Sequence, residues 1–168
     1  MEFELKTLSP EAVPRALAKA ERYRLLNEPH EAASICLDAL QADPDNQEAI
    51  TTLLLAITEQ FDHETKSLVS EAWHTVARLQ DEYERTYYTG LVYERRAKAL
   101  LRHGAPGCGP RAYEWLREAM TWYEKAEGIR PTGNDDPLLR WNACARLIMS
   151  DQHLVPMTED RGEPLLLE

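Results

Sequence analysis

The stretch over residues 13–46 constrains the fold most, because it combines two helical apolar stripes with two stop signals. Ala16, Ala20 and Tyr23 lie at positions i, i+4 and i+7, which is one face of a helix. Pro29 ends this helix, because proline pushes the preceding residue out of the helical region. A second apolar stripe follows before the next proline, and it consists of Ala32, Cys36, Ala39 and Leu40. We therefore expect two antiparallel helices here, with the second ending at Pro44.

Five landmarks of this unit match the tetratricopeptide repeat, a helical hairpin with a period of about 34 residues. They are Ala20, Tyr23, Ala32, Ala39 and Pro44. The large aromatic residue that the family carries early in its first helix is missing, since Ala16 stands there. The unit thus resembles this family. The resemblance implies an all-α, tetratricopeptide-like array of stacked helical hairpins (an α-solenoid) whose first helices line a concave groove.

The rest of the chain partly repeats this pattern, in degenerate form. A second unit over 47–80 has Leu54 where the family usually has a small residue, and its second helix is expected at about 64–80. The spacing Asp81-x-x-Glu84 matches a capping box and begins a third unit over 81–133, which ends in a loop at 128–133.

The third hairpin is expected to be elongated. Gly90 and its small partner Ala119 are 29 residues apart, whereas Ala20 and Ala32 of the first unit are 12 apart. The 17 additional residues predict two longer helices on either side of the glycine-rich turn 104–110.

A seventh helix over 135–150 is expected to cap the array, because the last repeat otherwise leaves an apolar face uncovered. We therefore predict about seven helices in a single domain over residues 1–150. Residues 151–168 are predicted to be a tail without regular structure. Its leucines, 165–167, have three possible places: the exposed side of the seventh helix or a groove, a neighbouring molecule, or a frayed end.

Charge and cysteine content bound the function. The net charge of −10 argues against nucleic acid as the main partner. Residues 25–65 contain nine acidic residues and no lysine or arginine, which either attracts a basic partner or simply keeps the surface solvated. Three widely spaced cysteines favour a reducing compartment, so we expect the cytoplasm. There is no run of about 18 apolar residues, so no membrane span is expected.

No catalytic constellation emerges from the sequence. His63-Glu64 lacks the second histidine of a zinc-protease helix, and the turn 104–110 lacks the lysine and hydroxyl residue of a phosphate-binding loop. Glu82, Glu84 and Glu94 are expected to face solvent on their helix. We therefore predict a protein that is not an enzyme and has no cofactor and no metal site.

The resemblance implies that the groove binds a partner protein or a peptide. Some family members clamp the C-terminal carboxylates of chaperones, but the clamp positions here hold other residues: Leu17, Glu21, Thr52, Glu84 and Tyr88. Placed by the resemblance, the groove lining includes Arg24, Leu55, Tyr87, Leu91, Arg95, Asn142 and Arg146.

Two of these residues, Arg95 and Arg146, suggest an acidic or carboxylate-terminated peptide, because guanidinium groups bind carboxylates through paired hydrogen bonds. In the alternative, both arginines pair with Glu94, Asp135 or Asp136 and bind nothing. An alternative function is a homo-oligomeric structural protein, such as a homodimer, that uses the aromatic-rich arm 83–123 or the tail as its interface.

Overall fold

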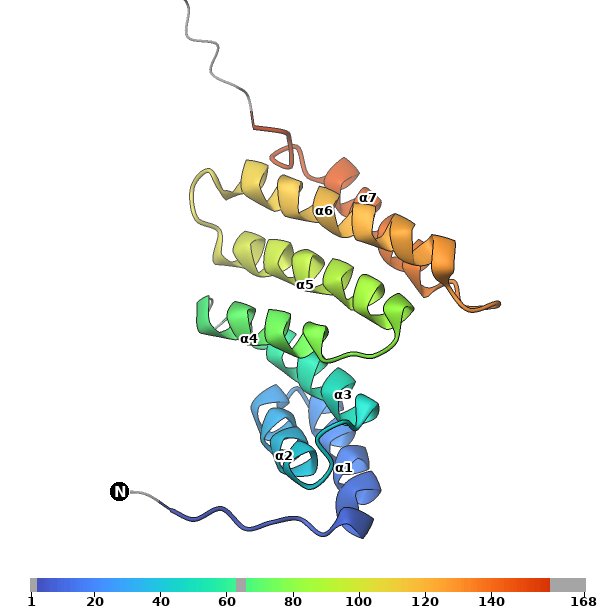
Figure 1. Cartoon of the computed structure of the whole chain (residues 1–168). Coiled ribbons are helices and arrows are strands. Elements are labelled where there is room, and N and C mark those ends of the chain that lie inside the picture. The colour runs from blue at the N-terminus through green and yellow to red at the C-terminus, as the bar shows by residue number, and fades with distance from the viewer. Residues whose placement is uncertain (1–2, 63–65, 158–168) are drawn as a thin grey trace, which may run out of the picture.

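The described part of the chain, residues 3–62 and 66–157 of a computed structural model, consists of helices and connecting turns with no strand. After a short 3₁₀ turn (η1, Pro10–Ala12), seven α-helices follow: α1 (Val13–Leu25), α2 (Pro29–Ala42), α3 (Gln47–Thr58), α4 (Lys66–Ala77), α5 (Glu82–His103), α6 (Cys108–Ile129) and α7 (Asp136–Ser150). Each helix packs on the next one along the chain, so the array rises from α1 to α7 (Figure 1). The all-α helical array predicted from the sequence is confirmed.

Local signals set where the helices begin and end. Asn27 adopts a positive φ of 60°, which turns the chain sharply between α1 and α2. The side chain of Asn46 caps α3 by accepting a hydrogen bond from the backbone N–H of Ala49 at 2.9 Å. The side chain of Asp81 caps α5 in the same way, from the N–H of Glu84 at 2.9 Å, as the capping-box spacing predicts.

Two predicted boundaries are wrong by a few residues. α4 ends at Ala77 rather than near residue 80, and the guanidinium of Arg85 donates to the carbonyls of Leu79 and Gln80, both at 2.7 Å. The guanidinium thus provides hydrogen bonds to two carbonyl oxygens that lie beyond the end of the helix. α6 continues to Ile129, into the predicted loop 128–133. The predicted start of the fourth helix, with His63 and Glu64, lies outside the described residues.

The third hairpin is elongated, as the spacing of its small residues predicts. Helices α5 and α6 have 22 residues each, whereas α1 to α4 have 12 to 14. Gly104 and Gly107, with φ of 63° and 75°, form the turn between them. Figure 1 shows the long pair lying across the shorter helices below it.

The core falls into two packed clusters of apolar residues. The first joins α1 to α4 with one side of α5, and small residues such as Ala20, Ala32 and Ala39 are completely buried in it. The second joins α5, α6 and α7 around Tyr123 and Cys144, which are also completely buried. Small residues at the helix contacts allow the axes to approach closely, and the larger rings fill the space beside them.

The predicted tail is only partly described. Residues 151–157 form no helix, in agreement with the prediction, but Leu154 is only 3% exposed and packs into the second cluster. The first part of the tail therefore lies against the end of the array instead of projecting from it. The leucines at 165–167 lie outside the described residues.

Candidate functional site

The first helix of each hairpin, together with α7, contributes to one connected surface. α1 contacts α3, α3 contacts α5, and Arg140 of α7 donates a hydrogen bond to Glu94 of α5. We call this surface the odd-helix face and define it by Arg24, Glu59, Tyr87, Tyr88, Arg95 and Arg140.

Two arginines from different helices share one carboxylate at this face. Arg24 donates to both oxygens of Glu59, with Nη2–Oε1 at 2.6 Å and Nε–Oε2 at 3.1 Å. The same arginine also pairs with Glu21 at 2.6 Å. Arg95 approaches Glu59 from α5, with 3.6 Å between Nη1 and Oε1. The cluster therefore ties α1, α3 and α5 together through paired charges.

Arg95 is held more rigidly than a surface arginine. Its Nη1 donates to the carbonyl of Leu55 at 3.0 Å and to the hydroxyl of Thr58 at 2.6 Å. Burial lowers the pKa of Arg95, the charge of Glu59 acts in the opposite direction, and the positive charges of Arg140 and Arg24 lower it further. About 20% of its side chain remains exposed. It is therefore a fixed, partly accessible cation that shares the carboxylate of Glu59 with Arg24.

A row of tyrosines continues the odd-helix face along α5. The rings of Tyr83 and Tyr87 are stacked with centroids 5.9 Å apart, and those of Tyr87 and Tyr88 meet edge to face at 5.1 Å. Burial, together with neighbouring tyrosines and acids, raises the pKa of Tyr88 to about 12, while the charge of Arg24 acts in the opposite direction. These half-buried rings form a rigid amphipathic surface next to the arginines.

A buried carboxylate supports this surface from beneath. Glu94 is 0% exposed, accepts a hydrogen bond from the Tyr123 hydroxyl at 2.6 Å and pairs with Lys98 at 2.5 Å and Arg140 at 3.3 Å. Burial opposes its ionisation, but the hydrogen bonds from Lys98 and Tyr123 and the nearby charges hold the pKa of Glu94 below its ordinary value. The cluster fixes α5, α6 and α7 to one another.

The predicted exposure of Glu94 is therefore wrong. The sequence holds a signal that would have revealed its burial, because Gly90, Glu94, Ala97 and Leu101 recur at helical spacing on a single face of α5. An acid in such a stripe requires partners from other helices, and only the fold supplies Tyr123 and Arg140.

The structure brings four of the predicted groove residues together on the odd-helix face: Arg24, Leu55, Tyr87 and Arg95. Leu91 is 1% exposed and belongs to the interior, so its predicted place in the lining is wrong. It lies on the inner side of α5, one turn from Tyr87, where neighbouring helices cover it.

The two predicted residues of α7 lie elsewhere. Asn142 borders a cavity between α6 and α7, next to Glu124 and Trp141. Arg146 is exposed and takes part in no ion pair among the described residues, and Arg140 is the α7 arginine whose charge reaches Arg95. The suggested partners of Arg95 are also wrong, since its carboxylate is Glu59 of α3.

Chemistry of other kinds finds little support in the described residues. Within 3–62 and 66–157, no three potential metal-binding side chains gather at one place. The cysteines are unpaired, and burial raises the pKa of the Cys36 and Cys144 thiols to about 12.

None of the helices in the part of the chain that the structure describes has the length and apolar character needed to cross a membrane. Comparisons with protein-family models, curated proteins and solved structures give no match.

Proposed function

We propose that this protein is a non-enzymatic, tetratricopeptide-like interaction module that binds a partner protein or peptide at the odd-helix face. The observation that carries the proposal is the continuous surface in which Arg24, Arg95 and Arg140 lie beside the stacked tyrosines of α5. Aromatic and arginine side chains are the ones that most often dominate binding energy at protein interfaces. The unpaired cysteines support a place in the reducing cytoplasm.

Packing supports the resemblance to the repeat family. The small landmarks Ala20, Ala32 and Ala39 are completely buried, as a close approach of two helices requires. In the third hairpin, a Cβ added to Gly90 would lie 3.2 Å from the carbonyl oxygen of Ala119. Two hairpins of different length thus use the same arrangement of small residues.

The chemistry of the face favours an acidic peptide as the ligand. Arg95 already contacts Glu59 at a long 3.6 Å, so a ligand carboxylate would compete with a weak interaction instead of displacing a short one. The tyrosine rings next to it provide apolar area, and little side-chain entropy is lost because they are already packed. An extended peptide with a carboxylate beside an apolar side chain satisfies both parts of the surface.

Peptide display on the purified full chain tests the proposal. We expect enrichment of acidic or carboxylate-terminated sequences, and isothermal titration of the best peptide should show binding that weakens about tenfold, or about 1.4 kcal/mol, in Arg95→Ala and in Tyr87→Ala. Arg117→Ala is the matched control, because Arg117 is an exposed arginine on α6 away from this face. Thermal melting of each variant separates lost binding from lost folding. Unchanged affinity in both face variants would refute the proposal.

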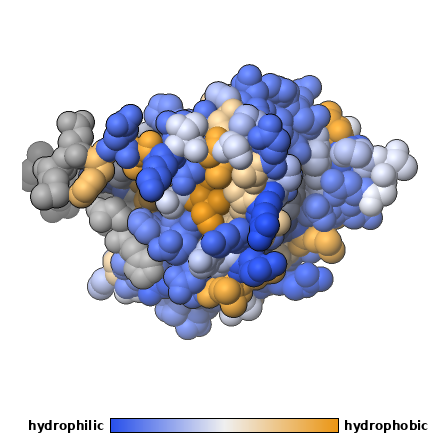
Figure 2. All heavy atoms as spheres, turned by 90° about the horizontal axis from the view of Figure 1, so that it is seen from below, coloured by the Kyte–Doolittle hydropathy of each residue, from blue (hydrophilic) through white to orange (hydrophobic). Residues whose placement is uncertain are grey.

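A second candidate function is homo-oligomeric assembly through exposed apolar residues. α7, the last helix of the array, exposes 64% of Leu139 and 78% of Met149. The opposite end of the array, viewed in Figure 2, also shows apolar areas within a mostly hydrophilic surface. Gel filtration with light scattering tests this alternative: a stable dimer at low micromolar concentration that Met149→Glu abolishes supports it, and a monomer excludes it.

A further inference from the structure

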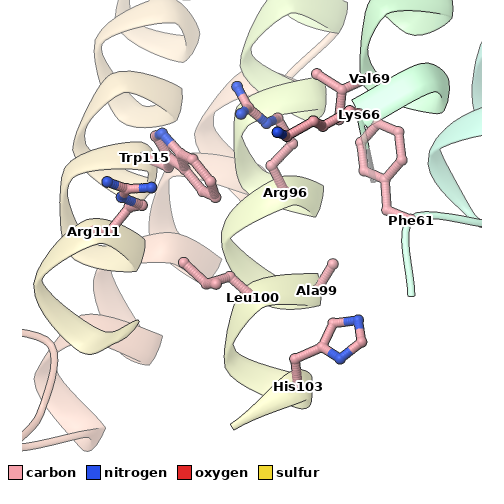
Figure 3. Close-up of a pocket in the computed structure, with 9 residues that line it drawn as sticks. All are labelled: Phe61, Lys66, Val69, Arg96, Ala99, Leu100, His103, Arg111 and Trp115. Atoms are coloured by element: carbon pink, nitrogen blue, oxygen red, sulfur yellow. The ribbon is translucent and has the colours of Figure 1, made fainter. Parts of the chain in front are cut away.

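A cavity of about 360 Å³ lies between α4 and the tip of the long hairpin, away from the odd-helix face (Figure 3). Its walls come from the described beginning of α4, the last turns of α5 and the first turns of α6. We call it the basic cavity and define it by Phe61, Lys66, Arg96, Leu100, Arg111 and Trp115.

One part of the basic cavity is apolar. Phe61 is almost completely buried at its base, and Leu100 and Trp115 are half-buried in its walls. Figure 3 shows the Trp115 ring on α6 to one side of α5 and the Phe61 ring on the other side of α5. Apolar surface of this shape favours the insertion of an apolar side chain.

The rest of the cavity is positively charged. Lys66, Arg96 and Arg111 come from three different helices, and within the described residues none of them forms an ion pair. Arg96 lies over the ring of Trp115, 4.2 Å from its centroid. By contrast, Arg24 and Arg140 each contact a carboxylate. In a chain of net charge −10, such a group of unpaired cations is a local reversal of sign.

The two guanidinium groups also act on each other. Burial lowers the pKa of Arg96, the nearby Tyr93 acts in the opposite direction, and the charge of Arg111 lowers it further. Two such cations, which pair with no carboxylate among the residues that the structure describes, gain free energy when an anion binds. The basic cavity is thus electrostatically prepared for a negatively charged ligand, and its apolar base requires that the ligand also carry an apolar group.

A neighbouring hollow indicates the form of this ligand. A second cavity of about 350 Å³ shares Leu100 and Arg111 with the basic cavity and continues along the α5–α6 turn past Pro106 to Met157. Together the two cavities form an elongated depression, which suits an extended chain better than a compact small molecule. Arginine side chains in such a depression bind carboxylates through paired hydrogen bonds.

We propose that the basic cavity binds an acidic peptide segment of a partner protein, with a leucine-like side chain against Leu100 and Trp115 and flanking carboxylates on Arg96 and Arg111. This site is independent of the odd-helix face, because it lies at the turns of the hairpins and uses different residues. The protein therefore has two separate surfaces, and it can hold two segments at once.

Fluorescence polarisation of the full chain with a labelled peptide, Gly-Glu-Glu-Leu-Leu-Glu-Glu-Gly, tests the proposal. We expect saturable binding that is about tenfold weaker in the double variant Arg96→Gln, Arg111→Gln, and about tenfold weaker for peptides with lysine for glutamate or serine for leucine. The matched control is Arg22→Gln, Arg117→Gln, which removes the same charge from exposed positions outside the cavity. Arg96→Lys should retain only part of the affinity, because an ammonium group keeps the charge but cannot form the paired hydrogen bonds.

Three outcomes overturn the proposal. The first is no binding of the acidic leucine peptide, and the second is equal weakening by the cavity variant and the control variant. The third concerns the chain's own segment 158–168, which also combines acids with leucines. If the peptide binds only when the leucines at 165–167 are replaced by serine, the occupant is this segment and not a partner protein.

Discussion

The substitution Gly90→Ala tests the packing of the long hairpin, because alanine is otherwise the better residue in a helix. A Cβ built at Gly90 lies 2.8 Å from Cε1 and 3.0 Å from Cδ1 of Tyr123, and 3.2 Å from the carbonyl oxygen of Ala119. The first two contacts are shorter than carbon atoms tolerate without movement. Tyr123 is completely buried and hydrogen-bonded to Glu94 at 2.6 Å, so its ring has little freedom to shift.

The expected magnitude follows from two opposing effects. Replacement of glycine by alanine in a helix interior stabilises by about 1 kcal/mol, whereas overpacking of a rigid core costs about 1–3 kcal/mol. Because both the ring and the backbone carbonyl resist displacement, we expect Gly90→Ala to lower the free energy of unfolding by about 1–2 kcal/mol. Urea denaturation followed by circular dichroism measures this difference.

Gly128→Ala is the matched control, since Gly128 also lies in a helix and an added Cβ would meet nothing within 4 Å. We expect this variant to be more stable than the parent by roughly 0.5–1 kcal/mol. The cost at Gly90 should persist in a Tyr123→Phe background, because the clashing ring atoms remain. If Gly90→Ala is as stable as the parent or more so, the close approach of α5 and α6 described above is wrong.

Three further predictions concern buried contacts between helices. Ala20→Leu and Ala119→Leu should each lower stability by about 1–3 kcal/mol in urea denaturation, because both positions are completely buried, and unchanged stability would contradict the helix contacts. Tyr123→Phe should cost about 1.5–3 kcal/mol in the same assay, since it removes a hydrogen bond to a buried carboxylate, and an unaffected protein would show that the bond contributes nothing. Because the pKa of Glu94 is lowered in the folded state, stability should fall below about pH 4.5. Because the pKa of Tyr123 is raised in the folded state, stability should also fall above about pH 10, and this alkaline loss should be smaller in Tyr123→Phe.

Much of the fold follows from the sequence because its signals are local. Helical spacing of apolar residues, Pro29 and the Asp81 cap define helices without reference to the rest of the chain. The length of the third hairpin follows from the separation of Gly90 and Ala119 along the chain. These two small residues can meet only if both helices are long enough to take up the residues between them.

The site was less predictable because it depends on contacts between helices. The positions of Arg24 and Arg95 in their helices predict that both lie on the same face of the array. Their shared partner Glu59 becomes evident only when α1, α3 and α5 are packed together. The same is true of Glu94. Its charge predicts an exposed side chain, and only the packed helices place Tyr123 and Arg140 around it. The basic cavity was not predicted at all, because residues of several helices form its walls and no local motif marks it.

Chemical-shift mapping of a ¹⁵N-labelled full chain with the best acidic peptide from display tests the central claim most directly. We expect amide shifts to change in α1, α3 and α5, centred on the residues around Arg24, Tyr87 and Arg95, and these changes to weaken in Arg95→Ala but not in Arg117→Ala. Shift changes confined to α2 and α6, or a response that is the same in both variants, would contradict a binding role for the odd-helix face.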